Sequence, residues 1–139
     1  MFKSVISATE NFLIHQIRVP YKTVMEIANS RVIFTSIDIQ IQNKSKYRVY
    51  LACESALIQK ITKIFLEEDD SDKETLIDMA LETTNLIIGS AKVIEEEKNQ
   101  NQCTIATPKL DKFDMNFKEF TTFDVQGNKL SIAIRKIDA

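Results

Sequence analysis

Hydrophobic and polar positions recur with two different periods along the first half of the chain. Between residues 2 and 17 the apolar side chains mostly follow helical spacing, which predicts an amphipathic helix that ends before Pro20. The run RVIFTSIDIQIQ at residues 31–42 alternates at Ile33, Thr35, Ile37, Ile39 and Ile41, and this period of two predicts a strand. A polar turn, NKSK, separates it from a second strand-like run at residues 47–53. The two runs therefore predict a β-hairpin.

Two helices are predicted in the middle of the chain. Ser55 is a plausible N-cap for the helix SALIQKITKIFL. The apolar stripe that this helix should bury consists of Leu57, Ile58, Ile61, Ile64 and Phe65. The acidic stretch EEDDSDKE that follows is interpreted as a solvated loop, and its Ser71-x-x-Glu74 pattern resembles a capping box. The second helix should therefore begin near Asp72 and continue to about Lys98.

Further strands are predicted on either side of this helical region. YKTVMEIA at residues 21–28 is compatible with a short strand, and CTIATPKL predicts a strand that ends near Pro108. In the tail, Gly127-Asn128 between two apolar runs predicts a tight hairpin. The order of helix, strands, two helices and strands favours an α+β layer structure, with residues 1–139 forming a single domain.

Composition and charge exclude several classes of protein. The 139 residues are 44% hydrophobic and 27% charged, with a formal net charge of -2, so no overall field favours nucleic acid or an anionic membrane. No apolar run approaches the roughly 18 residues of a membrane span, and we expect neither a signal peptide nor an anchor. Cys53 and Cys103 lack metal-binding spacing, which is typical of reduced, buried thiols in a cytoplasmic protein.

The second predicted helix carries an unusual polar stripe. Helical geometry places Asp78, Glu82, Asn85 and Gly89 on one side, which we expect to be exposed. The opposite side, which we expect to be buried, carries Leu76, Ala80, Ile87, Ala91 and Ile94. Glycine and asparagine weaken a helix by about 1 kcal/mol and about half of that, so solvation alone does not explain them.

Two interpretations of the stripe follow from these residue types. Glu82 and Asn85 are i,i+3 neighbours, with Cβ atoms about 5–6 Å apart, and can therefore reach one bound group together. Gly89 either lets another molecule approach the helix backbone or allows a close crossing within the chain.

The spacing of the stripe resembles the signature of the CheC/CheX/FliY phosphatases. That signature is Asp or Ser, then Glu four residues on, then Asn three further, and a distant Pro. Here Asp78, Glu82 and Asn85 are followed after twenty-two residues by Pro108. The GSAK that follows, the preceding hairpin and helix, and the closing hairpin are also similar to CheX. A single motif in the chain resembles CheX more than the duplicated CheC, although CheX-like chains usually carry more glycine around their first strand pair.

The resemblance implies a fold and an activity. The fold would be a roughly six-stranded, largely antiparallel sheet packed against two long central helices plus an N-terminal helix. The activity would be dephosphorylation of the aspartyl phosphate on a CheY-type response regulator in chemotaxis. Asn85 would orient the attacking water and Glu82 would dock on the regulator's lysine, while Asp78, Gly89 and Lys92 would contact the partner. The resemblance also implies no cofactor of the chain's own, Mg²⁺ supplied by the regulator, and a homodimer formed through sheet edges.

Other interpretations remain alongside this one. The main alternative is a non-catalytic module of the same fold that binds a response regulator or the flagellar switch. A structural homodimer would bury Asp78 and Glu82 at a cost, and without a pocket or further ligands these two carboxylates make a poor acid/base pair or metal site. His15 stands alone as an ordinary helix residue, and the basic residues form no patch that predicts nucleic-acid binding.

Overall fold

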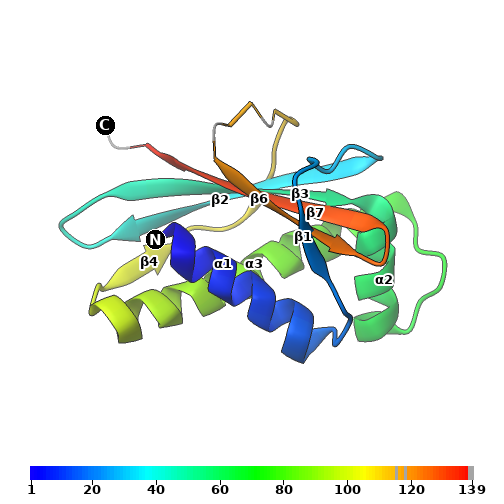
Figure 1. Cartoon of the computed structure of the whole chain (residues 1–139), viewed down its shortest axis with the longest axis horizontal. Helices are drawn as coiled ribbons and strands as arrows, with labels where there is room; N and C mark the ends of the chain where they lie inside the picture. Colours follow the sequence, from blue (N-terminus) through cyan, green and yellow to red (C-terminus); the bar gives the residue numbers. More distant parts are fainter. Residues whose placement is uncertain (115, 118, 138–139) are drawn as a thin grey trace.

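Three α-helices lie on one side of a twisted antiparallel sheet in the computed structural model, which describes residues 1–114, 116–117 and 119–137 (Figure 1). The helices are α1 (Phe2–Asn11), α2 (Ser55–Leu66) and α3 (Lys73–Asn99), and a short π-helix (Phe12–Gln16) extends α1. The strands are β1 (Lys22–Val24), β2 (Val32–Ile41), β3 (Lys46–Glu54), β4 (Cys103–Ile105), β5 (Lys109–Leu110), β6 (Phe120–Val125) and β7 (Asn128–Lys136). This is the expected α+β architecture, with seven strands where about six were expected.

The sheet has the strand order β1-β6-β7-β3-β2-β4, and β5 also pairs with β2. β2 and β3 form the predicted hairpin, with Val32 opposite Glu54 and Gln40 opposite Lys46. The short strand at residues 21–28 is confirmed as β1, which pairs with β6 at one edge. The strand predicted to end near Pro108 is present as two short pieces, β4 and β5, at the other edge.

The core lies between the sheet and the helices. Alternate residues of β3, such as Val49 and Leu51, point into it, while Tyr50 and Ala52 pack on the outer face in a second, smaller cluster. There Tyr50 stacks on Phe34, with ring centroids 5.7 Å apart, and Phe117 covers it at 4.9 Å. The central strand is therefore buried on both faces, which explains its continuous apolar run.

The starts of α2 and α3 differ from the sequence prediction by one residue. Ser55 is not the N-cap of α2, because Glu54 takes that position, and Asp72 rather than Ser71 caps α3 by accepting a 2.8 Å hydrogen bond from the Thr75 N–H. In α2 the predicted buried stripe holds at Leu57, Ile58 and Ile61. The last two residues of the predicted stripe are instead exposed, Ile64 to 42% and Phe65 to 39%.

Glu54 is buried and joins segments that are far apart in the sequence. Its carboxylate accepts hydrogen bonds from the backbone N–H groups of Asn29 (3.1 Å), Ser30 (3.3 Å) and Lys129 (3.0 Å). The segment before β2 and the β6–β7 hairpin are therefore attached to the start of α2.

Two other local predictions need correction. The N-terminal helix expected over residues 2–17 is α-helical only to Asn11. The following residues form the short π-helix, in which the Ile17 N–H donates to the Phe12 carbonyl at 3.1 Å. The tight turn of the last hairpin is formed by Gln126 and Gly127, one residue earlier than expected, and both have positive φ. In the described part of the chain, no helix is long and apolar enough to cross a membrane.

Candidate functional site

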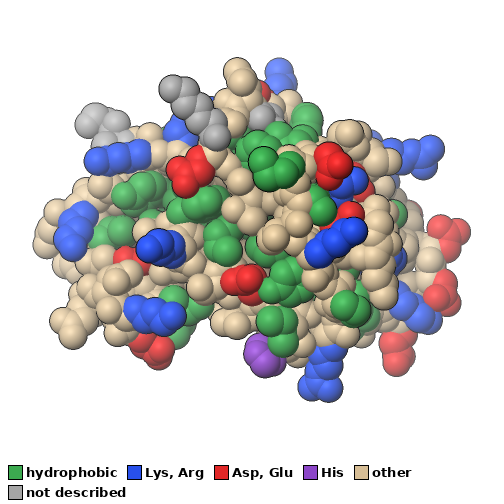
Figure 2. Space-filling view, viewed as in Figure 1, with side chains coloured by type: hydrophobic (Ala, Val, Ile, Leu, Met, Phe, Trp, Pro, Cys, Tyr) green, Lys and Arg blue, Asp and Glu red, His purple; other side chains and the backbone are tan. Residues whose placement is uncertain are grey.

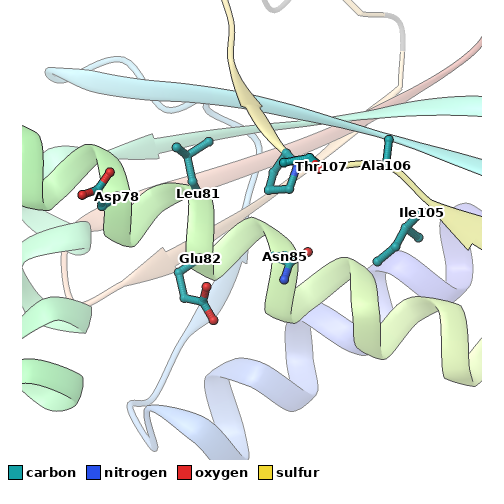
Figure 3. Close-up of a pocket in the computed structure, with 8 residues that line it drawn as sticks. Asp78, Leu81, Glu82, Asn85, Ile105, Ala106 and Thr107 are labelled. Carbon is teal, nitrogen blue, oxygen red and sulfur yellow. The ribbon is translucent and has the colours of Figure 1, made fainter.

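A groove of about 510 Å³ runs between α3 and the segment that joins β4 to β5. One wall is the polar side of α3 and the other is backbone and side chains of residues 105–108 (Figure 3). The lining residues are Asp78, Leu81, Glu82, Asn85, Ile105, Ala106, Thr107 and Pro108. The helix motif and the distant proline are thus brought together in one place.

The orientation of α3 is set by its contacts with the sheet and with α1. Ile87 and Ala91 are fully buried, and the Thr84 hydroxyl lies 2.6 Å from that of Thr35 on β2. These contacts turn the opposite side of the helix outward. Asp78, Glu82 and Asn85 are accordingly exposed, as the helical spacing predicted.

The three polar side chains of this face have no partner within the protein. Asp78, Glu82 and Asn85 form no hydrogen bond or ion pair with any other residue that the structure describes. Figure 3 shows Glu82 and Asn85 projecting from successive turns of α3, with Asp78 one turn before them. A carboxylate and a carboxamide are therefore free to bind an external group side by side.

The second wall of the groove is fixed to the sheet at both ends. Ile105 pairs with Ile39 on β2, and the Ala106 N–H donates to the Asp38 carbonyl at 2.9 Å. Beyond the groove, the Asp111 N–H donates to the Phe34 carbonyl at 2.9 Å. The segment that carries Thr107 and Pro108 therefore spans two anchored points.

Thr107 is a polar lining residue that the sequence reasoning missed. Its side chain is exposed in the groove next to Pro108, and it has no partner among the described residues. Its position just before Pro108 was the only sequence signal that could have drawn attention to it.

Gly89 and Lys92 lie one and two turns beyond Asn85 and do not line the groove. Apart from the adjoining residues and backbone of its own helix, a Cβ atom built on Gly89 would meet no described atom within 4 Å, so the interpretation that this glycine allows a close crossing within the chain is wrong. The Lys92 ammonium lies 3.3 Å from the Glu96 carboxylate, which also accepts a 3.1 Å hydrogen bond from the Cys103 N–H. That backbone hydrogen bond, together with Lys92, lowers the pKa of Glu96.

Other candidate groups lie elsewhere. His15 lines a small hollow between α1 and α3 that shares no lining residue with the groove. Both cysteines are free and buried, and burial raises the pKa of each thiol. In the described residues, no three His, Cys, Asp or Glu side chains gather as a metal site would require.

The chemistry available in the groove is binding and orientation. Of the eight described lining residues, none is a cysteine, serine or histidine, and the Thr107 hydroxyl has no base beside it. The Asn85 amide can both donate and accept a hydrogen bond, so it can hold a water molecule. The Glu82 carboxylate can accept from a cationic side chain.

One family model matches more than half of the chain. The family model described as "Chemotaxis phosphatase CheX" matches residues 36–116, a range that includes α3 and the groove. No curated protein matches the sequence.

Solved structures share the fold at low sequence identity. The crystal structure of the chemotaxis protein CheX from Vibrio vulnificus is similar with a TM-score of 0.79 and 21% identity, covering 97% of this chain and 95% of that chain. A CheX-CheY-BeF3-Mg complex from Borrelia burgdorferi is similar with a TM-score of 0.70 and 12% identity. The match covers 99% of this chain and 97% of that chain. The middle domain of FliM from Vibrio alginolyticus is a more distant match, with a TM-score of 0.55 and 8% identity. The match covers 97% of this chain and 90% of that chain.

Proposed function

The chain belongs to the CheX family of chemotaxis phosphatases, and on that premise we propose that it hydrolyses the aspartyl phosphate of a CheY-type response regulator. The observation that supports this most directly is the pair formed by Glu82 and Asn85. Both are exposed and unpartnered among the described residues, and they lie beside each other at a groove that Pro108 completes.

The proposed reaction is the attack of a water molecule on phosphorus. The water oxygen forms a bond to phosphorus while the bond to the aspartyl oxygen breaks, so that the products are inorganic phosphate and the free aspartate. The Asn85 amide accepts a hydrogen bond from the water and holds it in line with the breaking bond. The receiver domain, which is the phosphorylated domain of the regulator, supplies the Mg²⁺ and lysine that neutralise the phosphoryl charge. The phosphatase therefore needs no metal of its own.

Glu82 positions the two proteins. Its carboxylate pairs with the receiver's active-site lysine and so fixes where Asn85 stands relative to phosphorus. Small errors in such a position reduce rates strongly, which makes this docking contact part of the catalytic requirement. Asp78 contributes one turn away as a rim contact, and Gly89 and Lys92 extend the contact in the other direction.

The similar Borrelia burgdorferi structure supports this choice of partner. In that structure CheX is bound to CheY with BeF3 and Mg²⁺, a combination that mimics a phosphorylated receiver. The architecture of the present chain covers nearly all of that CheX.

The test is phosphate release from a phosphorylated CheY-type receiver domain with Mg²⁺. The wild-type protein should accelerate release, and Asn85→Ala should lower kcat by about a hundredfold or more, because the water is no longer oriented. Binding of Asn85→Ala to the beryllofluoride-activated receiver should persist, whereas Glu82→Ala should lose both binding and activity. Asn11→Ala, which removes an exposed asparagine from α1, serves as the matched control and should keep full activity. Full activity of Asn85→Ala would contradict the assigned role.

A non-catalytic docking module of the same fold is the second candidate. The observation behind it is the similarity to the FliM middle domain, which shows that this fold also occurs in a protein that is not described as a phosphatase. Such a module would bind an activated receiver or a switch component without releasing phosphate. Wild-type binding with no acceleration of phosphate release would favour this candidate.

We also propose that two copies pair through sheet edges in the cytoplasm. β1 lies at one edge of the sheet, and β4 and β5 lie at the other. Light scattering of the purified protein would give the mass of a dimer if one of these edges is paired.

A further inference from the structure

A second hollow lies next to the groove, at the N-terminal end of α3. Its volume is about 220 Å³, and six of its eight lining residues are apolar: Val32, Ile33, Phe34, Ile77, Leu110 and Phe113. Leu110 is 51% exposed and Phe113 is 49% exposed, so two large apolar side chains border the hollow without being covered. Lys73 and Asp111 add one charge of each sign to its lining.

The hollow shares both walls with the groove that holds Glu82 and Asn85. On the helix wall, Ile77 directly precedes Asp78, the first groove residue. On the other wall, Leu110 follows Pro108 by two residues. The two depressions are therefore neighbours along α3 and along the 105–113 segment, and residues of β2 complete the lining of the second one.

The wall of the hollow is firmly held. The ring of Phe113 meets that of Phe34 edge to face, with centroids 5.5 Å apart. The Asp111 carboxylate accepts a 2.9 Å hydrogen bond from the Ser36 hydroxyl, and this bond lowers the pKa of Asp111. Leu110 also pairs in register with Thr35 on β2. The exposed apolar side chains thus stand on a preformed surface, which is favourable for binding because little ordering is needed.

We propose that this hollow is a specificity subsite that receives an apolar side chain of the receiver domain. The inference rests on the proposed function. From Ile77 to Asn85 is eight residues of helix, or about 12 Å at a rise of 1.5 Å per residue. The hollow and Asn85 are thus separated along the helix axis by about this length, and the cognate receiver is expected to present an apolar side chain on that side of its phosphorylated aspartate.

The size of a protein interface explains why the receiver is the occupant. A specific complex covers about 800 Å² on each partner, which is far more than Glu82 and Asn85 offer. A receiver that brings its aspartyl phosphate to Asn85 must extend along α3 in at least one direction. Towards Ile77 it meets a hollow with apolar side chains at its border, and the few residues that dominate binding energy in interfaces typically lie in well-packed, desolvated pockets. The polar contact at Glu82 fixes the position of the receiver on α3. The hollow distinguishes between receivers that have similar active sites but differ in the apolar side chain they present.

The test compares two leucines of nearly equal exposure. Leu110→Ser removes an apolar side chain at the hollow. Leu66→Ser is the matched control at the end of α2, where the leucine is 49% exposed and lines neither depression. Binding is measured by calorimetry with a beryllofluoride-activated CheY-type receiver domain and Mg²⁺, and turnover by phosphate release. Leu110→Ser should raise Kd and KM roughly tenfold with kcat unchanged, as expected for loss of one interface anchor. Leu66→Ser should match the wild type, and Leu110→Met should restore most of the affinity.

Several outcomes would overturn the inference. An unchanged Kd for Leu110→Ser, or an equal rise for Leu66→Ser, would show that the hollow is not part of the interface. Conversion of a wild-type dimer to a monomer by Leu110→Ser, seen by light scattering, would assign the hollow to a second copy of the chain. The proposed function fails in a different way, through receiver binding without phosphate release. Because Kd is measured without turnover, the subsite can be judged in that case too, and a wild-type protein that bound no receiver would refute both.

Discussion

Replacing Gly89 by alanine should stabilise the protein while weakening its contact with the receiver domain. Gly89 lies in the interior of α3, where glycine is less favourable than alanine by about 1 kcal/mol. Beyond the adjoining part of its own helix, the added Cβ meets no described atom within 4 Å, so no clash with the rest of the protein subtracts from this gain. With an unfolding entropy of about 2.1 cal/mol/K per residue, 1 kcal/mol raises the Tm of a 139-residue chain by about 3 °C.

The functional effect of the same change should have the opposite sign. If Gly89 is small because the receiver comes close to the helix backbone, then a methyl group placed there is tolerated in the free protein but clashes in the complex. We expect Gly89→Ala to raise Kd for the activated receiver several-fold, in keeping with a cost of about 1–3 kcal/mol for overpacking a close contact.

The assay is thermal unfolding and calorimetric binding on the same preparations. Ser90→Ala is the control, because it also improves helix propensity but lines the hollow against α1 rather than the receiver-facing side. Higher Tm with unchanged Kd in Gly89→Ala would refute the idea that this glycine admits the partner. A lower Tm for Gly89→Ala than for the wild type would contradict the expectation that the added methyl group meets no neighbouring side chain.

Two further predictions concern stability. Glu54→Gln should lower the free energy of unfolding by about 2–3 kcal/mol, measured by urea denaturation, because the NH2 group that replaces one carboxylate oxygen cannot accept the backbone N–H bonds made to that oxygen. Arg48 donates two hydrogen bonds to Asp38, at 2.7 and 3.1 Å, and this lowers the pKa of Asp38. The folded state therefore binds that proton less readily than the unfolded state, so the stabilisation is present above about pH 4 and is lost as the pH falls through the lower folded-state pKa. Asp38→Asn should accordingly be less stable than the wild type by about 1 kcal/mol at pH 7, and the difference should shrink towards pH 3.

The exposed face of α3 was predictable because one long helix lies on one sheet. A helix in that position must bury a single side, and the period of 3.6 residues identifies the other side from the sequence alone. Ile87 and Ala91 are buried and Glu82 and Asn85 are exposed for this reason. The strands of the β2–β3 hairpin were predictable from their period of two and the polar turn between them.

The second wall of the groove was not predictable from local patterns. The position of Pro108 beside α3 depends on the pairing of β4 and β5 with β2, which joins residues about seventy positions apart in the chain. The choice of helix caps had a similar cause. Ser55 is a good capping residue in isolation, but Glu54 holds three distant backbone N–H groups and the helix begins directly after it.

The position of β7 in the sheet has a consequence for how the protein is made. Of the strands that the structure describes, β7 comes latest in the sequence, yet it lies in the interior of the sheet, between β6 and β3. At a synthesis rate of about 5–20 residues per second, the roughly 80 residues between the end of β3 and the end of β7 take about 4 to 16 seconds to emerge. During that interval the apolar edge of β3 has no partner on one side, and an unpaired edge of this kind promotes aggregation. The nascent chain should therefore be a substrate for chaperones until β7 has been made and has paired with β3.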